Sequence, residues 1–198
     1  ARYIELSLYD GIKGMYNVLK DISGKNDPIL FARAINIAIR KMFLLDDLEE
    51  NLAFYRAREI NQGDADKHYA KALQYIKDVE HSRDLKRAKK LAFAEMKKVK
   101  IDEKKEVLKV DLTGEIYLVC DSFSNQNITK ELGKMGVQVR RSLTVSSFIK
   151  DAIIPKAFRD GETHLQRAYR LAKPYLMRDI GGDALECVSD VVFADEKG

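Results

Sequence analysis

Polar side chains with binding chemistry gather just after an apolar, β-rich run that ends at Gly114. They are carboxylates, a phenol, a hydroxyl and amides: Glu115, Tyr117, Asp121, Ser124, Asn125 and Asn127. In α/β proteins, ligands bind outside the carboxyl end of a strand, where backbone amides at the start of the next helix favour an anion or a polar group. The pattern therefore predicts a substrate-binding loop over 114–127. For Ser124 and Asn125, a plain helix N-cap is an equally good interpretation.

A second candidate, Gly181-Gly182-Asp183, precedes the last expected helix. Paired glycines allow positive φ or a close backbone approach, so we include these three residues in the substrate-binding site. A loop in which Asp183 is the N-cap is the alternative. Because the loops that follow parallel strands lie at one edge of the sheet, we expect 114–127 and 181–183 to border a common cleft. No residue is assigned as catalytic.

Metal chemistry is not expected from this sequence. Asp78 and His81 stand three residues apart, but no second pair completes a ligand set. Cys120 and Cys187 lack a CxxC partner, which is typical of reduced thiols in the cytoplasm. No apolar run approaches the roughly 18–20 residues of a membrane-spanning helix, so we expect no membrane association.

The same motifs resemble a family: the CoA-substrate-specific enzyme activase and 2-hydroxyacyl-CoA dehydratase-like proteins. The similarity is carried by Gly114-Glu115-Ile116-Tyr117, Phe123-Ser124-Asn125, the step from Leu132 through Gly136 to Val139, and the stretch from Gly181 to Glu186. The resemblance implies a lyase or reductase acting on CoA thioesters through iron–sulfur electron chemistry. It also implies a partnership with an ATP-dependent activator domain or protein.

The chain departs from this family at its cysteines. The family's next strand and cysteine-bearing loop are expected just beyond Gly198, and neither Cys120 nor Cys187 matches a cluster ligand. We therefore expect an internal fragment that is inactive alone and holds no cofactor. A [4Fe–4S] cluster remains an expectation for the longer protein only.

The elements that would position these residues change character along the chain. Helical spacing predicts a helix over 8–22 with Gly24 as its stop, and Asp27-Pro28 as the start of another that reaches Arg58. Within it, 29–45 is apolar on almost every face and should be the buried centre, and the acidic cluster 46–50 should mark its emergence into solvent. Apolar stripes predict further helices over 69–79 and 85–99.

After a charged connection at 100–106, the pattern changes to strand and helix in alternation. It predicts strands at 107–112 and 137–139, and between them a helix from 128 that ends at Gly136. We therefore predict an α/β fold, in which a helical subdomain (1–100) precedes an incomplete Rossmann-like parallel-sheet subdomain (107–198). An unfinished sheet edge invites pairing with another copy, which would give a homo-oligomer.

Charge offers an alternative function. The chain carries a net charge of +4, and 83–105 holds ten basic and four acidic residues. This stretch could make the protein a non-catalytic binding module that docks an acidic partner or a nucleic acid. Phe93 is the one aromatic side chain within it, too few for a stacking platform, so nucleic acid is the less expected partner.

Overall fold

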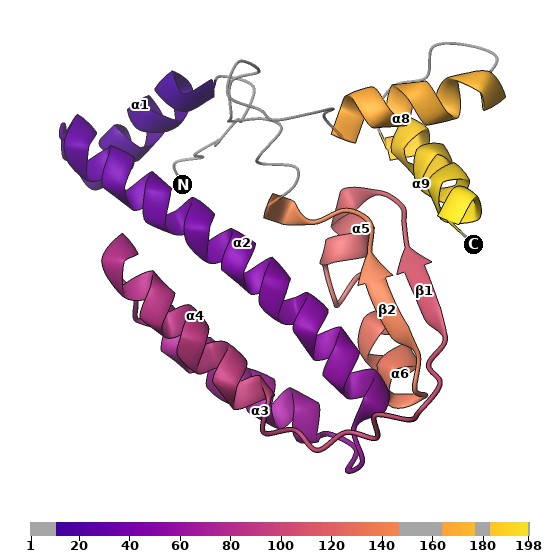
Figure 1. Cartoon of the computed structure of the whole chain (residues 1–198). Helices are drawn as coiled ribbons and strands as arrows, with labels where there is room; N and C mark the ends of the chain where they lie inside the picture. The colour runs from indigo at the N-terminus through magenta and orange to yellow at the C-terminus, as the bar shows by residue number, and fades with distance from the viewer. Residues whose placement is uncertain (1–10, 147–163, 177–182, 198) are drawn as a thin grey trace.

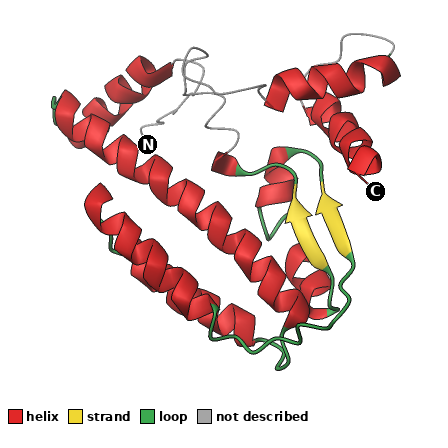
Figure 2. Ribbon diagram, in the orientation of Figure 1, coloured by secondary structure: helices red, strands yellow, loops and turns green. Residues whose placement is uncertain are grey.

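The computed structural model describes residues 11–146, 164–176 and 183–197, which are mostly helical with a small parallel sheet (Figures 1 and 2). The elements are α1 (Gly11–Ser23), α2 (Pro28–Arg58), α3 (Asp64–Lys77), α4 (Ser82–Met96), β1 (Lys109–Leu112), α5 (Ile116–Cys120), α6 (Ile128–Lys134), β2 (Gln138–Arg141), α8 (His164–Ala172), the 3₁₀ turn η2 (Lys173–Tyr175) and α9 (Asp183–Lys197). This confirms a mixed α/β chain in which helix predominates.

Local chemistry sets the helix ends where the sequence predicts them. Gly24 follows α1 with a φ of 67°. The Asp27 carboxylate accepts hydrogen bonds from the backbone N–H groups of Ile29 and Leu30, at 3.0 and 2.9 Å, and Pro28 takes the first helical position. Helix α2 ends at Arg58, as expected.

The interpretation of 29–45 as a buried centre is wrong. Ile29 is 67% exposed and Leu30 is 47% exposed, whereas the buried residues of α2 are Leu44, Leu48, Leu52 and Ala57. The reason is length: α2 has 31 residues, and the helices that cover it, α3 and α4, have 14 and 15. A helix rises about 1.5 Å per residue, so these two cover only part of α2.

The acidic cluster is only half in solvent: Asp47 and Glu50 are exposed, as expected, whereas Asp46 and Glu49 contact the rest of the molecule. Asp46 bonds to the backbone N–H and the hydroxyl of Ser146. Glu49 forms an ion pair with Arg141. These partners belong to β2 and the segment after it, so the cluster joins α2 to the sheet.

The main core lies between α2, α3 and α4. Four of the residues predicted as the stripe of α4, Leu85, Ala88, Ala92 and Met96, are buried, and Val99 just after it is buried too. Ile76 from α3 and Leu48 from α2 join the same core. Residues 69–79 pack on it as their spacing predicts.

Strands β1 and β2 pair in parallel, with Lys109 opposite Gln138 and Leu112 opposite Arg141. Helix α6 lies between them in sequence, and Gly136 after it has a φ of 84°, a conformation that glycine adopts readily. The strands, the helix and the stop were all predicted within two residues.

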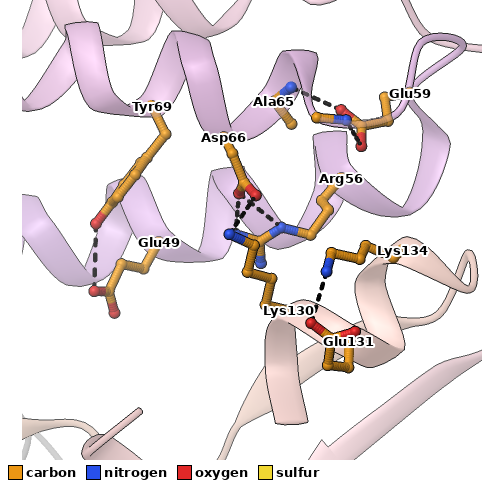
Figure 3. A network of polar contacts seen from close by, with 10 residues as sticks. Glu49, Arg56, Glu59, Ala65, Asp66, Tyr69, Lys130, Glu131 and Lys134 are labelled. Carbon is orange, nitrogen blue, oxygen red and sulfur yellow. Dashed lines mark hydrogen bonds and ion pairs between the residues drawn. The ribbon is translucent and has the colours of Figure 1, made fainter. Parts of the chain in front are cut away.

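Helix α2 contacts both parts of the molecule: α3 and α4 on one side, β2 and α6 on the other (Figure 1). A polar network ties these elements together (Figure 3). Arg56 of α2 bonds to Asp66 of α3, and Lys130 of α6 reaches the same carboxylate at 3.3 Å.

Helices α8 and α9 pack on each other around Ala168, Ala172 and Leu185. Asp190 of α9 accepts a hydrogen bond of 3.1 Å from the hydroxyl of Thr113, just after β1. Among the residues described, no helix combines the length and apolar character needed to cross a bilayer.

Candidate functional site

The 114–127 loop follows the carboxyl end of β1, as predicted. Gly114 has a φ of 154°, and the next residue, Glu115, is the N-cap of α5. Its carboxylate accepts a hydrogen bond of 3.0 Å from the N–H of Leu118. Glu115 therefore satisfies one of the donors that every helix start leaves unpaired, while the residue itself is exposed.

Asp121 and Asn125 also serve their own loop. The Asp121 carboxylate accepts a 2.7 Å bond from the N–H of Ser124, and hydrogen bonding by Ser124 lowers the pKa of this carboxyl. The Asn125 amide donates to the carbonyls of Leu118 and Val119, at 3.0 and 3.3 Å. The alternative interpretation of Ser124 or Asn125 as the N-cap of the next helix is wrong, because Asn127 takes that position and the Asn125 amide bonds carbonyls near the end of α5.

The side chains that the loop exposes include two aromatic rings, Leu118 and the amide of Asn127. Tyr117 is 63% exposed, Phe123 is 91% exposed, and Leu118 between them is exposed as well. The Oδ1 atom of Asn125 is buried and has no hydrogen-bond partner. Asn127 is exposed, with a φ of 57° and no capping bond from its side chain.

The second candidate segment is only partly visible. Gly181 and Gly182 lie outside the described residues, so the cleft shared by 114–127 and 181–183 stays a prediction. Asp183 opens α9, as expected. The bond from Thr113 to Asp190 anchors α9 beside the start of the 114–127 loop.

The two cysteines are unpaired and partly buried. Burial, with a smaller contribution from the charge of Asp46, raises the pKa of the Cys120 thiol. Such a thiol is a poor nucleophile near neutral pH, because the thiolate is the reactive form. Within the described parts of the chain, no group of three or more His, Cys, Asp or Glu side chains could hold a metal ion.

The basic stretch is divided between internal contacts and solvent. Lys89 forms a 2.6 Å ion pair with Asp47, and Lys98 pairs with the buried carboxylate of Glu95. Other basic side chains of α4 are exposed: Arg83, Lys86, Arg87 and Lys90. They recur every three or four residues, which places them on one broad strip of the helix.

Sequence reasoning missed an open groove of about 400 Å³ between α2, α4 and the start of β2. Its lining includes Asp47, Glu50, Asn51 and Phe54 from α2, and Lys89 and Phe93 from α4. The sequence did contain a signal for this groove. The spacing of a single helix face is shared by residues 47, 50, 51 and 54, and also by residues 89 and 93. Only the packing of α4 and β2 beside α2 turns these faces into a groove.

Comparison with protein-family models, with curated proteins and with solved structures finds no match for this chain.

Proposed function

We propose that the chain supplies one wall of a substrate pocket in a 2-hydroxyacyl-CoA dehydratase-like protein that works with an ATP-dependent activator. In this interpretation the part after residue 107 is an incomplete Rossmann-like subdomain. The proposal rests on the family resemblance together with one observation: the 114–127 loop directly follows the carboxyl end of a parallel strand. We also assign the protein to the cytoplasm, which its two unpaired cysteines support.

The roles proposed within the loop follow from its contacts. Glu115 and Asp121 hold the backbone of the loop in shape, because their carboxylates are engaged by N–H groups. Tyr117 and Phe123 would offer aromatic surface to the adenine or the acyl chain of a CoA thioester. Asn127, which is exposed, would bond the amides of the pantetheine arm, and Asn125 would support it from within the loop through its bonds to Leu118 and Val119. No general acid or base is assigned.

Titration of the ¹⁵N-labelled chain with butyryl-CoA, followed by amide NMR, tests this proposal. We expect shifts at 115–127 that Tyr117→Ala removes. Tyr175→Ala is the matched control, because that phenol is 66% exposed on a different element. Shifts confined to α4 that vanish with added salt would contradict the proposal, because they would report only phosphates bound to a basic helix.

A second candidate function follows from the exposed basic side chains of α4: a module that docks an acidic protein partner. Affinity for an oligo-aspartate peptide should fall steeply as salt rises, because exposed charges are screened. Replacing Lys86 and Lys90 by Gln should weaken that binding, and replacing Lys13 and Lys20 of α1 should not. Equal effects of the two pairs would mean that only the net charge matters.

A further inference from the structure

We propose that the groove between α2, α4 and β2 binds a small planar organic cation of the amidinium or guanidinium class. Its volume of about 400 Å³ lies in the range of small-molecule sites. It lies apart in sequence from the 114–127 loop, and none of the residues that line it belongs to that loop. The inference therefore does not depend on the function proposed above.

The groove combines aromatic and polar walls. Phe54 of α2 and Phe93 of α4 both line it. Each ring already has a cation near it: the Arg58 guanidinium lies 4.1 Å from the centroid of Phe54, and the Lys89 ammonium lies 5.5 Å from that of Phe93. Aromatic rings attract cations through the negative charge on their faces, so a flat ligand that is both apolar and positively charged would stack on the parts of these rings that Arg58 and Lys89 do not cover.

The polar groups left open in the groove are hydrogen-bond acceptors. Oδ1 of Asn51 is buried without a partner. Glu50 is exposed, and its carboxylate makes no hydrogen bond or ion pair with the described residues. By contrast, Asp47 is held by Lys89 at 2.6 Å, and Oε1 of Gln138 is occupied by Arg58 at 2.7 Å. A ligand for this groove must therefore bring N–H donors.

The charges of the side chains that line the groove also favour a cationic ligand. Among the side chains that line the groove, Asp47 and Lys89 neutralise each other, which leaves the negative charge of Glu50. The guanidinium of Arg58, which bonds Gln138, is a positive charge beside the groove from which a cationic ligand must keep its distance. The negative charge of Glu50 also acts on Arg140. However, the guanidinium of Arg140 is bound to Asp111, and this hydrogen bond is the main reason that the pKa of Arg140 is raised. An anion would be repelled by Glu50 and would leave Asn51 unsatisfied. The planar fork of an amidinium matches a carboxylate and can reach a neighbouring carbonyl oxygen.

Benzamidine is the probe, with neutral benzamide as its near-isostere. Calorimetry and amide NMR on the full chain should show benzamidine binding at 47–54 and 89–93, and benzamide binding roughly tenfold more weakly or not at all. Glu50→Gln should reduce benzamidine affinity by roughly tenfold, because a charged hydrogen bond is replaced by a neutral one. Glu103→Gln removes an exposed carboxylate outside the groove and should change nothing.

The Asn51→Leu variant tests whether Asn51 contributes to ligand binding without being needed for folding. Replacing an unsatisfied buried acceptor by an apolar group should leave the melting temperature unchanged or higher, while benzamidine binding weakens. Benzamide binding as tightly as benzamidine would overturn the proposal. So would a Glu50→Gln variant that binds benzamidine as well as the parent chain does.

Discussion

Carboxylates in this chain often serve its own backbone rather than a ligand. Glu115 and Asp121 bond N–H groups three residues ahead, and Glu59 accepts from the N–H groups of Gly63 and Ala65 at 2.8 and 2.7 Å (Figure 3). Short acidic side chains near helix starts commonly act in this way. At the scale of single residues, the exposed groups left for a partner include the rings of Tyr117 and Phe123 and the carboxylate of Glu50.

Gly133 shows why one small residue matters at a helix contact. A Cβ built on it would overlap the Cδ of Arg56 and lie 3.0 Å from its Cγ. We expect Gly133→Ala to destabilise the protein by about 1–2 kcal/mol. Overpacking costs about 1–3 kcal/mol, and the higher helix propensity of alanine offsets this by up to about 1 kcal/mol. Urea unfolding measures it. In an Arg56→Ala background the same change should cost less, and equal costs would contradict the proposed overlap.

Asp66 should make the stability depend on pH. Partial burial raises its pKa, but the hydrogen bonds and charges of Arg56 and Lys130 outweigh this, and the pKa lies below its usual value. A lowered pKa means that the stabilisation is complete above the unfolded pKa of about 3.9 and is lost as pH falls through the folded pKa.

The corresponding variant is Asp66→Asn. Its unfolding free energy should be lower than that of the parent at pH 7, by on the order of 1 kcal/mol because both partners keep contact with water. The difference should shrink below about pH 4 as Asp66 becomes protonated. Urea unfolding across this range measures it, with Asp21→Asn on the exposed side of α1 as the control. A difference that is constant with pH would contradict the proposed ion pairs.

At the scale of elements, one edge of the two-stranded sheet carries backbone groups that no described strand pairs. The N–H of Gln138 bonds the carbonyl of Leu108, and that of Ser142 bonds Leu112. Because successive residues of a strand direct their backbone N–H and C=O groups to opposite sides, those of Lys109 and Asp111 point away from β2. Among the described strands, β1 pairs with β2 alone, so this outer edge is available for another strand.

We expect the protein to self-associate through that edge. Lys109→Pro would remove one outward N–H and should reduce association, while the ladder to β2 is kept. Lys109→Gln is the control, because it removes the same charge but keeps the N–H. Light scattering across concentration compares the two. Association that is identical in both variants would show that the edge of β1 is not the contact.

At the scale of the molecule, α2 is shared by both parts. Its second half packs on α3 and α4, and the same half contacts β2 and α6 (Figure 1). Asp46 and Glu49 strengthen this connection through Ser146 and Arg141. The helical and α/β parts should therefore unfold together rather than one after the other.

Leu48→Ala tests this cooperativity. Leu48 is fully buried, so its truncation should cost about 2–5 kcal/mol and lower hydrogen-exchange protection in β2 as well as in α4. Leu30→Ala is the matched control in the same helix, where the exposed side chain should cost less than about 1 kcal/mol. Unchanged protection in β2 would mean that the two parts fold independently.

Sequence alone determined the features that depend on local backbone chemistry. Asp27-Pro28 starts α2, Gly24 and Gly136 follow helix ends, and the stripe from Leu85 to Val99 is buried. It also placed a parallel strand before the 114–127 loop, because the change from helical to strand periodicity is a local signal.

Tertiary structure decided which of these surfaces meet. Ile29 and Leu30 at the apolar start of α2 are exposed, because the buried residues of this helix all lie from Leu44 onward. Asp46 and Glu49 in its acidic middle instead contact Ser146 and Arg141. The groove at Glu50 and Asn51 exists only because α4 and β2 lie beside α2. Contacts between segments this far apart depend on how elements of unequal length pack, which local periodicity does not encode.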